Sequence, residues 1–258
     1  MKILVAADIH YSLKQYDWLL AVAGGFDLVV IAGDLLEISS SVDRRAQVVV
    51  VKTYLEQIAE KTRVAVCSGN HDLDTIDGNG EQVADWMRDL DDLGVASDST
   101  TIRMGQTLIT ICPWWDGPDT REAIAEQLVA AAAQPRDRWI WVYHAPPSES
   151  PVSWGGKRSF GDTELLQWIA RFHPDIVVSG HVHQSPFVTG GSWADRIDGT
   201  WVFNTGQQIG EVPAHIIFDM ETCTALWFSI YGNEVLDLEA PLERPIQPLR
   251  ALPDWLRA

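Results

Sequence analysis

The chain has 258 residues, 46% of them hydrophobic, which is enough to bury a large core in one domain or two small ones. Its formal charge of −17 disfavours long nucleic acids, because duplex binding depends on lysine and arginine at the phosphates. No segment is apolar over the roughly 18 residues that a membrane span needs, and the first residues lack the pattern of a secretory signal. We therefore expect a globular, cytoplasmic protein with no membrane partner.

The first third of the chain alternates short apolar runs with helical patterns. The apolar runs predict buried strands at 2–7, 28–32 and 63–67. Between them, amphipathic spacing predicts helices at 13–23 and 43–61. This βαβαβ order predicts parallel strands with helices covering the sheet.

The rest of the chain changes character after its middle. In chain order we expect a helix near 81–93, a strand pair at 101–104 and 107–111, an alanine-rich helix at 120–133, a strand ending at His144, a helix from Asp162 to 172, and a strand at 175–178. Short strands at 201–203, 214–219 and 225–231 predict a second, more antiparallel sheet. The four prolines of 239–258 predict an arm that lies on the surface or reaches a partner subunit.

Polar and titratable residues directly follow five of the predicted strands. They are Asp8 and His10, then Asp34, then Asn70, His71 and Asp72, then His144, and finally His181 and His183. Ligands of an open α/β sheet bind beyond the carboxyl ends of its strands, so we expect these side chains to meet. Residues two apart in extended chain point to the same side, which lets His181 and His183 converge on one point.

The residue types at these strand ends predict bound metal. A single histidine after a strand is more often a hydrogen-bonded residue than a ligand, but five of the seven histidines lie here. Without a cation, Asp8 and Asp34 would repel each other and the imidazoles would lose hydration, whereas a divalent ion attracts both groups. His173 and His215 have no such neighbours, and we interpret both as structural.

The motif order DxH, GD, GNHD, H and GHxH resembles the signature of the calcineurin-like metallophosphoesterase family, and in particular its smaller bacterial members. The blocks run from Asp8 to His183. The resemblance implies an α/β fold, a four-layer αββα sandwich in which two mixed sheets are flanked by helices. We expect a single metallophosphoesterase domain over 1–238, followed by the proline-rich C-terminal arm at 239–258.

The resemblance also implies two divalent metal ions. By position, one ion would be held by Asp8, His10 and His183, the other by Asn70, His144 and His181, and both by Asp34. The mixed nitrogen and oxygen ligands suit Mn, Fe, Co, Ni or Zn, which leaves the metal identity open. A hydroxide between the two ions would attack phosphorus in line.

The resemblance assigns the general acid to His71, which would protonate the leaving oxygen. Asp72 would then orient the imidazole ring or raise its basicity. The alternative interpretation is that Asp72 only caps its own loop.

Hydrolysis of a small phosphodiester is the function that the resemblance favours. A phosphomonoesterase of the same fold and a non-catalytic metal-binding scaffold are the alternatives, and cleavage of short oligonucleotides stays open. The family's Ser/Thr protein phosphatases carry GDxVDRG in the second block, where this chain reads GDLLEIS and lacks the arginine. This argues against a protein phosphatase. The sequence leaves a homo-oligomer possible.

Three loops are expected to select the substrate, at 73–80, 113–119 and 145–161. The last contains Lys157 and Arg158, which either grip a substrate phosphate or are solvated surface charges. Four tryptophans lie among glycine, proline and aspartate residues and are candidates for the wall of a pocket. They are Trp114, Trp115, Trp154 and Trp193.

Overall fold

The computed structural model describes residues 1–256, and its first sheet has eight strands in the order β16-β15-β14-β13-β1-β2-β3-β6. The bounds are β1 (Lys2–Ala6), β2 (Leu28–Ala32), β3 (Arg63–Cys67), β6 (Val95–Ala96), β13 (His215–Asp219), β14 (Thr224–Ser229), β15 (Gly232–Asp237) and β16 (Gln247–Pro248). Strands β1, β2, β3 and β6 are parallel, and β13 to β16 continue the sheet in antiparallel pairing. The sheet is therefore mixed.

The second sheet has six strands in the order β11-β12-β10-β9-β8-β7. The bounds are β7 (Thr100–Met104), β8 (Thr107–Ile111), β9 (Arg138–Val142), β10 (Ile176–Ser179), β11 (Ala194–Ile197) and β12 (Thr200–Asn204). The four central strands are parallel and both edge strands are antiparallel, so this sheet is mixed as well. A separate small hairpin pairs β4 (Thr75–Ile76) with β5 (Gln82–Val83).

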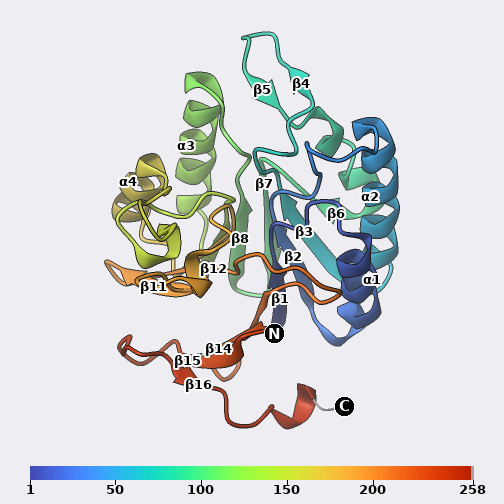
Figure 1. Cartoon of the computed structure of the whole chain (residues 1–258). Coiled ribbons are helices and arrows are strands. Elements are labelled where there is room, and N and C mark those ends of the chain that lie inside the picture. Colours follow the sequence, from blue (N-terminus) through green and yellow to red (C-terminus); the bar gives the residue numbers. More distant parts are fainter. Residues whose placement is uncertain (257–258) are drawn as a thin grey trace.

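Four α-helices cover the outer faces of the two sheets. They are α1 (Leu13–Val22), α2 (Arg44–Ala59), α3 (Pro118–Ala132) and α4 (Thr163–Phe172). Short 3-10 helices occupy Ala23–Gly25, Asp85–Met87, Asp91–Leu93, Pro151–Ser153, Ser185–Phe187 and Asp254–Leu256. Figure 1 shows α1 and α2 on one side of the molecule, α3 and α4 on the other, and the sheets between them. The predicted four-layer αββα sandwich is confirmed.

The core forms three layers because the central strands are buried on both faces. Leu28 and Val30 of β2 pack between the two sheets, while Val29 and Ile31 pack under α1 and α2. A third cluster joins β9 and its neighbours to α3 and α4. Burial of one such aliphatic side chain contributes about 1.5–3 kcal/mol. The unbroken apolar runs that predicted these strands are thus explained by burial on both sides.

The predicted helix near 81–93 is wrong. The segment instead contains β5 and the two 3-10 helices at Asp85–Met87 and Asp91–Leu93. The carboxylate of Glu81 accepts hydrogen bonds from the backbone N–H groups of Asp119 and Thr120 at the start of α3. Trp86 donates its indole N–H to the carbonyl of Asp72 at 2.9 Å. These tertiary contacts outweigh the helix propensity of the segment.

The expectation that the late strands form a second sheet of their own is also wrong. Strand β12 joins the second sheet beside β10, whereas β13 and β14 extend the first sheet from the free edge of β1. Val5 of β1 lies opposite Ile216 of β13 in an antiparallel pair. The second sheet consists mainly of β7 to β10, which come from the middle of the chain. Apolar alternation identifies a strand but not its neighbour, which explains the error.

The chain after β15 crosses the edge of the first sheet. Ile246 is buried against the core between the sheets, and β16 pairs with β15. The ammonium group of Lys2 lies 3.8 Å from the centre of the Trp255 ring. The last two residues of the predicted arm at 239–258 lie outside the described residues.

Within 1–256, no helix combines the length and the apolarity needed to span a bilayer.

Candidate metal centre

The five predicted blocks lie at strand ends of both sheets. Asp8 and His10 follow β1, Asp34 follows β2, Asn70 to Asp72 follow β3, His144 follows β9, and His181 and His183 follow β10. All of these strands except β9 and β10 belong to the first sheet. The backbone N–H of Gly180 donates to the carbonyl of His144, and the backbone N–H of Asp8 donates to the carbonyl of Gly33. The loops are thereby fixed to one another.

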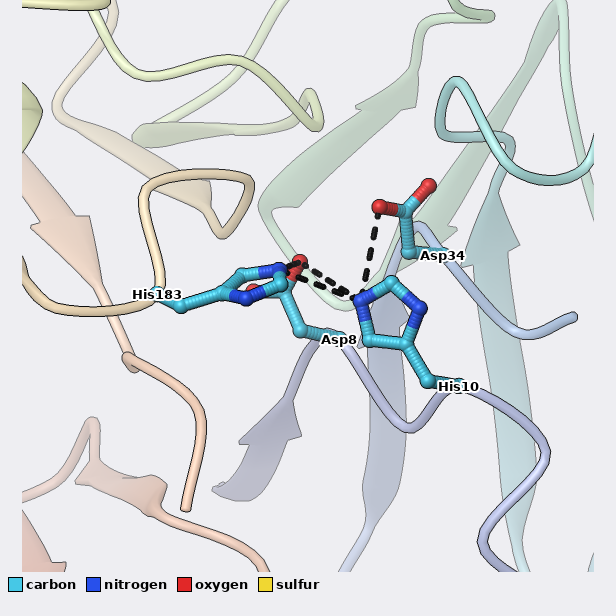
Figure 2. Close-up of side chains that lie close together, drawn as sticks. All are labelled: Asp8, His10, Asp34 and His183. Carbon is cyan, nitrogen blue, oxygen red and sulfur yellow. Dashed lines mark hydrogen bonds and ion pairs between the residues drawn. The ribbon is translucent and has the colours of Figure 1, made fainter. Parts of the chain in front are cut away.

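The first group of candidate ligands is formed by Asp8, His10, Asp34 and His183, whose ligand atoms lie within 4.8 Å of one another. Figure 2 shows the two imidazoles converging beside the carboxyl groups. The Nε2 atom of His183 lies 3.3 Å from Oδ1 of Asp8 and 3.1 Å from Nε2 of His10. The Nε2 atom of His10 lies 3.7 Å from Oδ2 of Asp34. In the first motif, Nε2 of His10 lies 3.9 Å from Oδ1 of Asp8. In the last motif, the expected convergence of His181 and His183 on one point is wrong, because only His183 belongs to this group.

A second group of candidate ligands is formed by Asp34, His144 and His181. The Nε2 atom of His144 lies 3.2 Å from Oδ2 of Asp34. Asn70 adjoins this group, because its Oδ1 atom lies 2.9 Å from Nδ1 of His181. Asp34 belongs to both groups, and the structure brings together all seven residues that the sequence predicted as metal ligands.

The backbone at four of these residues is left-handed. The φ angles are 54° at Asp8, 46° at His10, 53° at Asp34 and 65° at His181. Left-handed backbone is uncommon for residues with a Cβ atom, and each instance costs on the order of 1–3 kcal/mol. The surrounding contacts hold it in place: both carboxylate oxygens of Asp8 lie 3.0 Å from the backbone N–H of His181, which donates to them.

Glycines let the neighbouring backbone approach the two carboxylates. A Cβ atom at Gly180 would lie 2.5 Å from Oδ2 of Asp8. A Cβ atom at Gly69 would lie 2.2 Å from Oδ1 and 2.6 Å from the backbone nitrogen of Asp34. Neither separation is compatible with an ordinary side chain, so both positions require glycine.

Gly69→Ala is expected to lower the free energy of unfolding by about 1–3 kcal/mol, because Asp34 and its backbone must move to make room for the methyl group. Denaturant unfolding of the metal-free protein measures the change. Gly78→Ala is the matched control, since a Cβ atom there meets nothing within 4 Å. Equal stability of the two variants would contradict the close approach at Gly69.

The buried charges of the second group favour positive charge between them. Burial alone would raise the pKa of Asp34, but the adjacent His144 holds it below its usual range. Burial likewise lowers the pKa of His144, but attraction to Asp34 prevails and raises it to about 9. Burial and the nearby His144 lower the pKa of His181 to about 4. His181 is thus neutral near pH 7, the form that binds metal.

The donor set fits a divalent metal ion. The Nδ1 atom of His144 lies 2.7 Å from the carbonyl oxygen of Ala32, which fixes Nδ1 as the donor and turns Nε2 toward the carboxylates. That Nε2 atom is buried and makes no hydrogen bond of good geometry. A buried nitrogen facing a carboxylate oxygen is stable only when a cation, either a proton or a metal ion, lies between them. Imidazole nitrogen with carboxylate and amide oxygen is a ligand set typical of first-row transition metals and zinc.

The family assignment follows from a match over most of the chain. Residues 1–185 match the family model for calcineurin-like phosphoesterases, and this range contains all of the strand-end residues described above. The chain belongs to the calcineurin-like phosphoesterase family. This match supports a metal-dependent phosphoesterase and agrees with the resemblance that the motifs carry. No curated protein is significantly similar to the chain.

Two solved structures share the fold. TT1561 of Thermus thermophilus superposes with a TM-score of 0.57 at 12% identity, over 92% of this chain and 98% of that chain. The purple acid phosphatase PPD1 from yellow lupin (Lupinus luteus) seeds superposes with a TM-score of 0.56 at 16% identity, over 93% of this chain and 52% of that chain. At these identities the similarity concerns the fold alone.

Asp72 makes contacts that differ from those predicted for a partner of His71. Its buried carboxyl group accepts hydrogen bonds from the backbone N–H groups of Leu35, Leu36 and Gly69 at 2.8–3.2 Å. Burial, followed by repulsion from Asp34, raises its pKa to about 7. Among the described residues it has no hydrogen bond to His71. Asp72 thus fastens the GNHD loop to the chain that follows Asp34, and a role in orienting His71 stays a prediction.

The carboxylate beside His71 belongs to Glu37, which the sequence analysis did not single out. Its Oε1 atom lies 3.5 Å from Nδ1 of His71, and its Oε2 atom lies 3.3 Å from Nδ1 of His10. The rings of His10 and His71 meet edge to face, with their centres 4.5 Å apart. The one available signal was a carboxylate three residues after the GD motif. Glu37 thus contacts one candidate ligand and the candidate acid.

Proposed function

We propose that the chain hydrolyses small phosphodiesters with two divalent cations and that Asp34 is the ligand common to both. The observation that carries this proposal is the position of Asp34 Oδ2, 3.2 Å from Nε2 of His144 and 3.7 Å from Nε2 of His10. These two imidazoles belong to different groups of candidate ligands. In the proposal, Asp8, His10 and His183 complete one cation site, and Asn70, His144 and His181 complete the other.

Two bound cations would offset charge on the phosphate oxygens and make a water molecule nucleophilic near neutral pH. Glu37 lies 3.3 Å from Nδ1 of His10, on the side of the ring opposite the centre, and Nε2 of His10 is directed at Asp34. The hydrogen bond from Nδ1 of His144 to Ala32 keeps Nε2 directed at the centre. The chain therefore presents its ligand atoms before any substrate arrives, which lowers the cost of organising the site.

His71 is the proposed general acid. Its Nδ1 atom lies 3.5 Å from Oε1 of Glu37, and this contact on one side of the ring leaves Nε2 to donate to the leaving oxygen. Glu37 is a positioning residue in this scheme, because it acts through His71 and His10. Asp72 supports the same loop from behind by accepting backbone N–H groups.

The charge of the site favours a diester over a monoester. Asp8 and Asp34 among the candidate ligands, with Glu37 beside them, supply three negative charges, and the histidines that bind metal are neutral. Two divalent cations leave a net charge of about +1 by simple addition of formal charges, and the sum is unchanged when the hydroxide nucleophile and the proton carried by the acid are both included. A phosphodiester carries one negative charge, whereas a phosphomonoester carries about two near neutral pH. Binding of the diester therefore brings the net charge of the site close to zero.

The proposal is tested with Mn²⁺-loaded protein and two substrates that share p-nitrophenolate as the leaving group. We expect kcat/KM for bis(p-nitrophenyl) phosphate to exceed that for p-nitrophenyl phosphate by at least about tenfold, and chelation to abolish both activities. Glu37→Gln removes one negative charge from the site and should lower the ratio of diester to monoester kcat/KM about tenfold. Glu60→Gln, an exposed carboxylate at the end of α2, is the control of equal charge change.

Two results would count against the proposal. A protein with two bound metal ions per chain and no turnover of either ester would favour the scaffold alternative. A ratio in favour of p-nitrophenyl phosphate would favour the phosphomonoesterase alternative.

A further inference from the structure

An aromatic pocket adjoins the candidate metal centre on the side of His181. It has a volume of about 310 Å³, and its wall includes Trp114, Trp115, Tyr143, Phe160 and His181. This volume is at the lower end of the range for small-molecule sites. Of the tryptophans that the sequence offered for a pocket, Trp114 and Trp115 lie in this wall. Trp193 does not, because it is buried between the sheets with its ring parallel to Trp227.

The pocket is continuous with the second group of candidate ligands. The ring of Trp114 lies 5.2 Å from that of His181 and 5.7 Å from that of His144, measured between centres. His181 itself forms part of the wall. A phosphate held at the metal centre would therefore carry one of its ester groups at the mouth of this pocket.

The polar side-chain atoms of Trp115, Tyr143 and Asp162 in the wall are already paired. Asp162 accepts hydrogen bonds from the indole N–H of Trp115 at 2.9 Å and from the hydroxyl of Tyr143. Its other carboxylate oxygen caps α4 by accepting from the backbone N–H groups of Glu164 and Leu165. Asp162 thus holds Trp115 and Tyr143 in place and uses its own acceptors in doing so. Trp115 and Tyr143 are left with ring surface for a ligand to contact.

Two arginines offset the acidic character of the chain at this pocket. The guanidinium of Arg158 lies 4.6 Å from the centre of the Phe160 ring, and that of Arg121 lies 5.7 Å from the centre of the Trp115 ring. Phe160 is 41% exposed and is therefore accessible at the mouth. Arg121 also lies 3.6 Å from Glu164, so the two arginines together balance the carboxylates of Glu164 and Asp162. An anionic ester therefore meets no net negative charge from these four residues.

We propose that this pocket binds a planar aromatic ring of the substrate, so that the natural ester is an aryl or nucleoside phosphodiester. The inference rests on the proposed function, because a phosphate bound at the metal centre would place the substrate's ring in the pocket. Trp115 and Phe160 are the specificity-determining residues, and they act through ring contact. Such contact is tolerant of ring type, because every aromatic ring has a face to stack.

The test measures binding to Mn²⁺-loaded protein with two pairs of probes that differ by a ring. Phenylphosphonate is compared with methylphosphonate, and thymidine 5′-monophosphate with ribose 5-phosphate. Calorimetric Kd values and competitive inhibition of bis(p-nitrophenyl) phosphate hydrolysis are the two measurements. We expect the probe with the ring to bind at least about tenfold tighter in one pair or both, and the pair with the larger ratio identifies an aryl or a nucleobase source.

The ring contacts are removed with Phe160→Leu and, separately, Trp115→Leu, which keep apolar bulk but not the ring. We expect the ratio to fall to about threefold or less in each. Trp115→Phe keeps a ring without the hydrogen bond to Asp162 and should restore part of the ratio. Val49→Ala, which shortens an exposed apolar side chain on α2, should leave the ratio unchanged.

The outcomes separate this inference from the proposed function. Wild-type ratios below about threefold in both pairs, or ratios that survive both leucine substitutions, would overturn the ring pocket even if diesters are hydrolysed. A protein that hydrolyses nothing but discriminates between the probes would retain the ring pocket and lose the proposed function.

Discussion

Asp34→Asn is expected to reduce kcat/KM for a phosphodiester by at least about a thousandfold, because two cations lose the charge of their common ligand. Asparagine keeps the size of the side chain and tolerates left-handed backbone, so the φ of 53° at this position is preserved. Its amide oxygen can still accept the hydrogen bond that the backbone N–H of His71 donates to Asp34 Oδ1 at 2.9 Å. The substitution therefore changes charge with little change of shape.

Metal analysis after gel filtration measures the cause directly. We expect about two ions per chain in the wild-type protein and one or none in Asp34→Asn. Asp89→Asn, which removes a carboxylate that is 77% exposed, is the matched control and should retain both ions. A variant at Asp34 with two bound ions and wild-type turnover would remove the basis of the proposed mechanism.

The effect of His71→Ala on kcat is expected to depend on the leaving group. For a diester with an alkyl leaving group, loss of the general acid should reduce kcat by about 100- to 10,000-fold. For p-nitrophenolate, which departs without protonation, the reduction should stay within about tenfold. Both substrates use the same metal centre, so the difference between the two reductions in kcat measures the contribution of proton transfer.

The control for this variant is His173→Asn, a histidine that ends α4 in left-handed backbone with a φ of 49°. It removes an imidazole while keeping a residue type that accepts this conformation. Equal losses on both leaving groups in His71→Ala would contradict an acid role. Such a result would instead assign His71 to the support of His10, whose ring it contacts.

The central strands were predictable because burial on both faces leaves a continuous apolar run. Val29 and Ile31 face helices while Leu28 and Val30 face the other sheet, so the sequence must be apolar throughout. The candidate ligands were predictable for a related reason: the position just past a buried strand is fixed by the strand itself. The segment 81–93 was not, because Glu81 caps a helix that lies more than thirty residues later in the sequence.

The position of Glu37 beside the candidate ligands could not be predicted from a sequence pattern. Glu37 follows Asp34, whose backbone is left-handed, in a stretch with no helical or strand period, and its carboxylate contacts His10 and His71. Asp72, by contrast, is adjacent to His71 in the sequence but turns toward backbone N–H groups. Adjacency along an irregular loop therefore does not determine which side chains meet.

The left-handed conformation of Asp8, His10, Asp34 and His181 restricts evolution at these positions independently of any metal. Aspartate, asparagine and histidine are the residues other than glycine that adopt this conformation most readily, and β-branched or bulky side chains adopt it poorly. Glutamate and cysteine, although competent to coordinate metal, adopt it less readily, even though Glu149 and Cys223 do so elsewhere in this chain. Backbone sterics and coordination chemistry thus favour the same few residue types at these four positions.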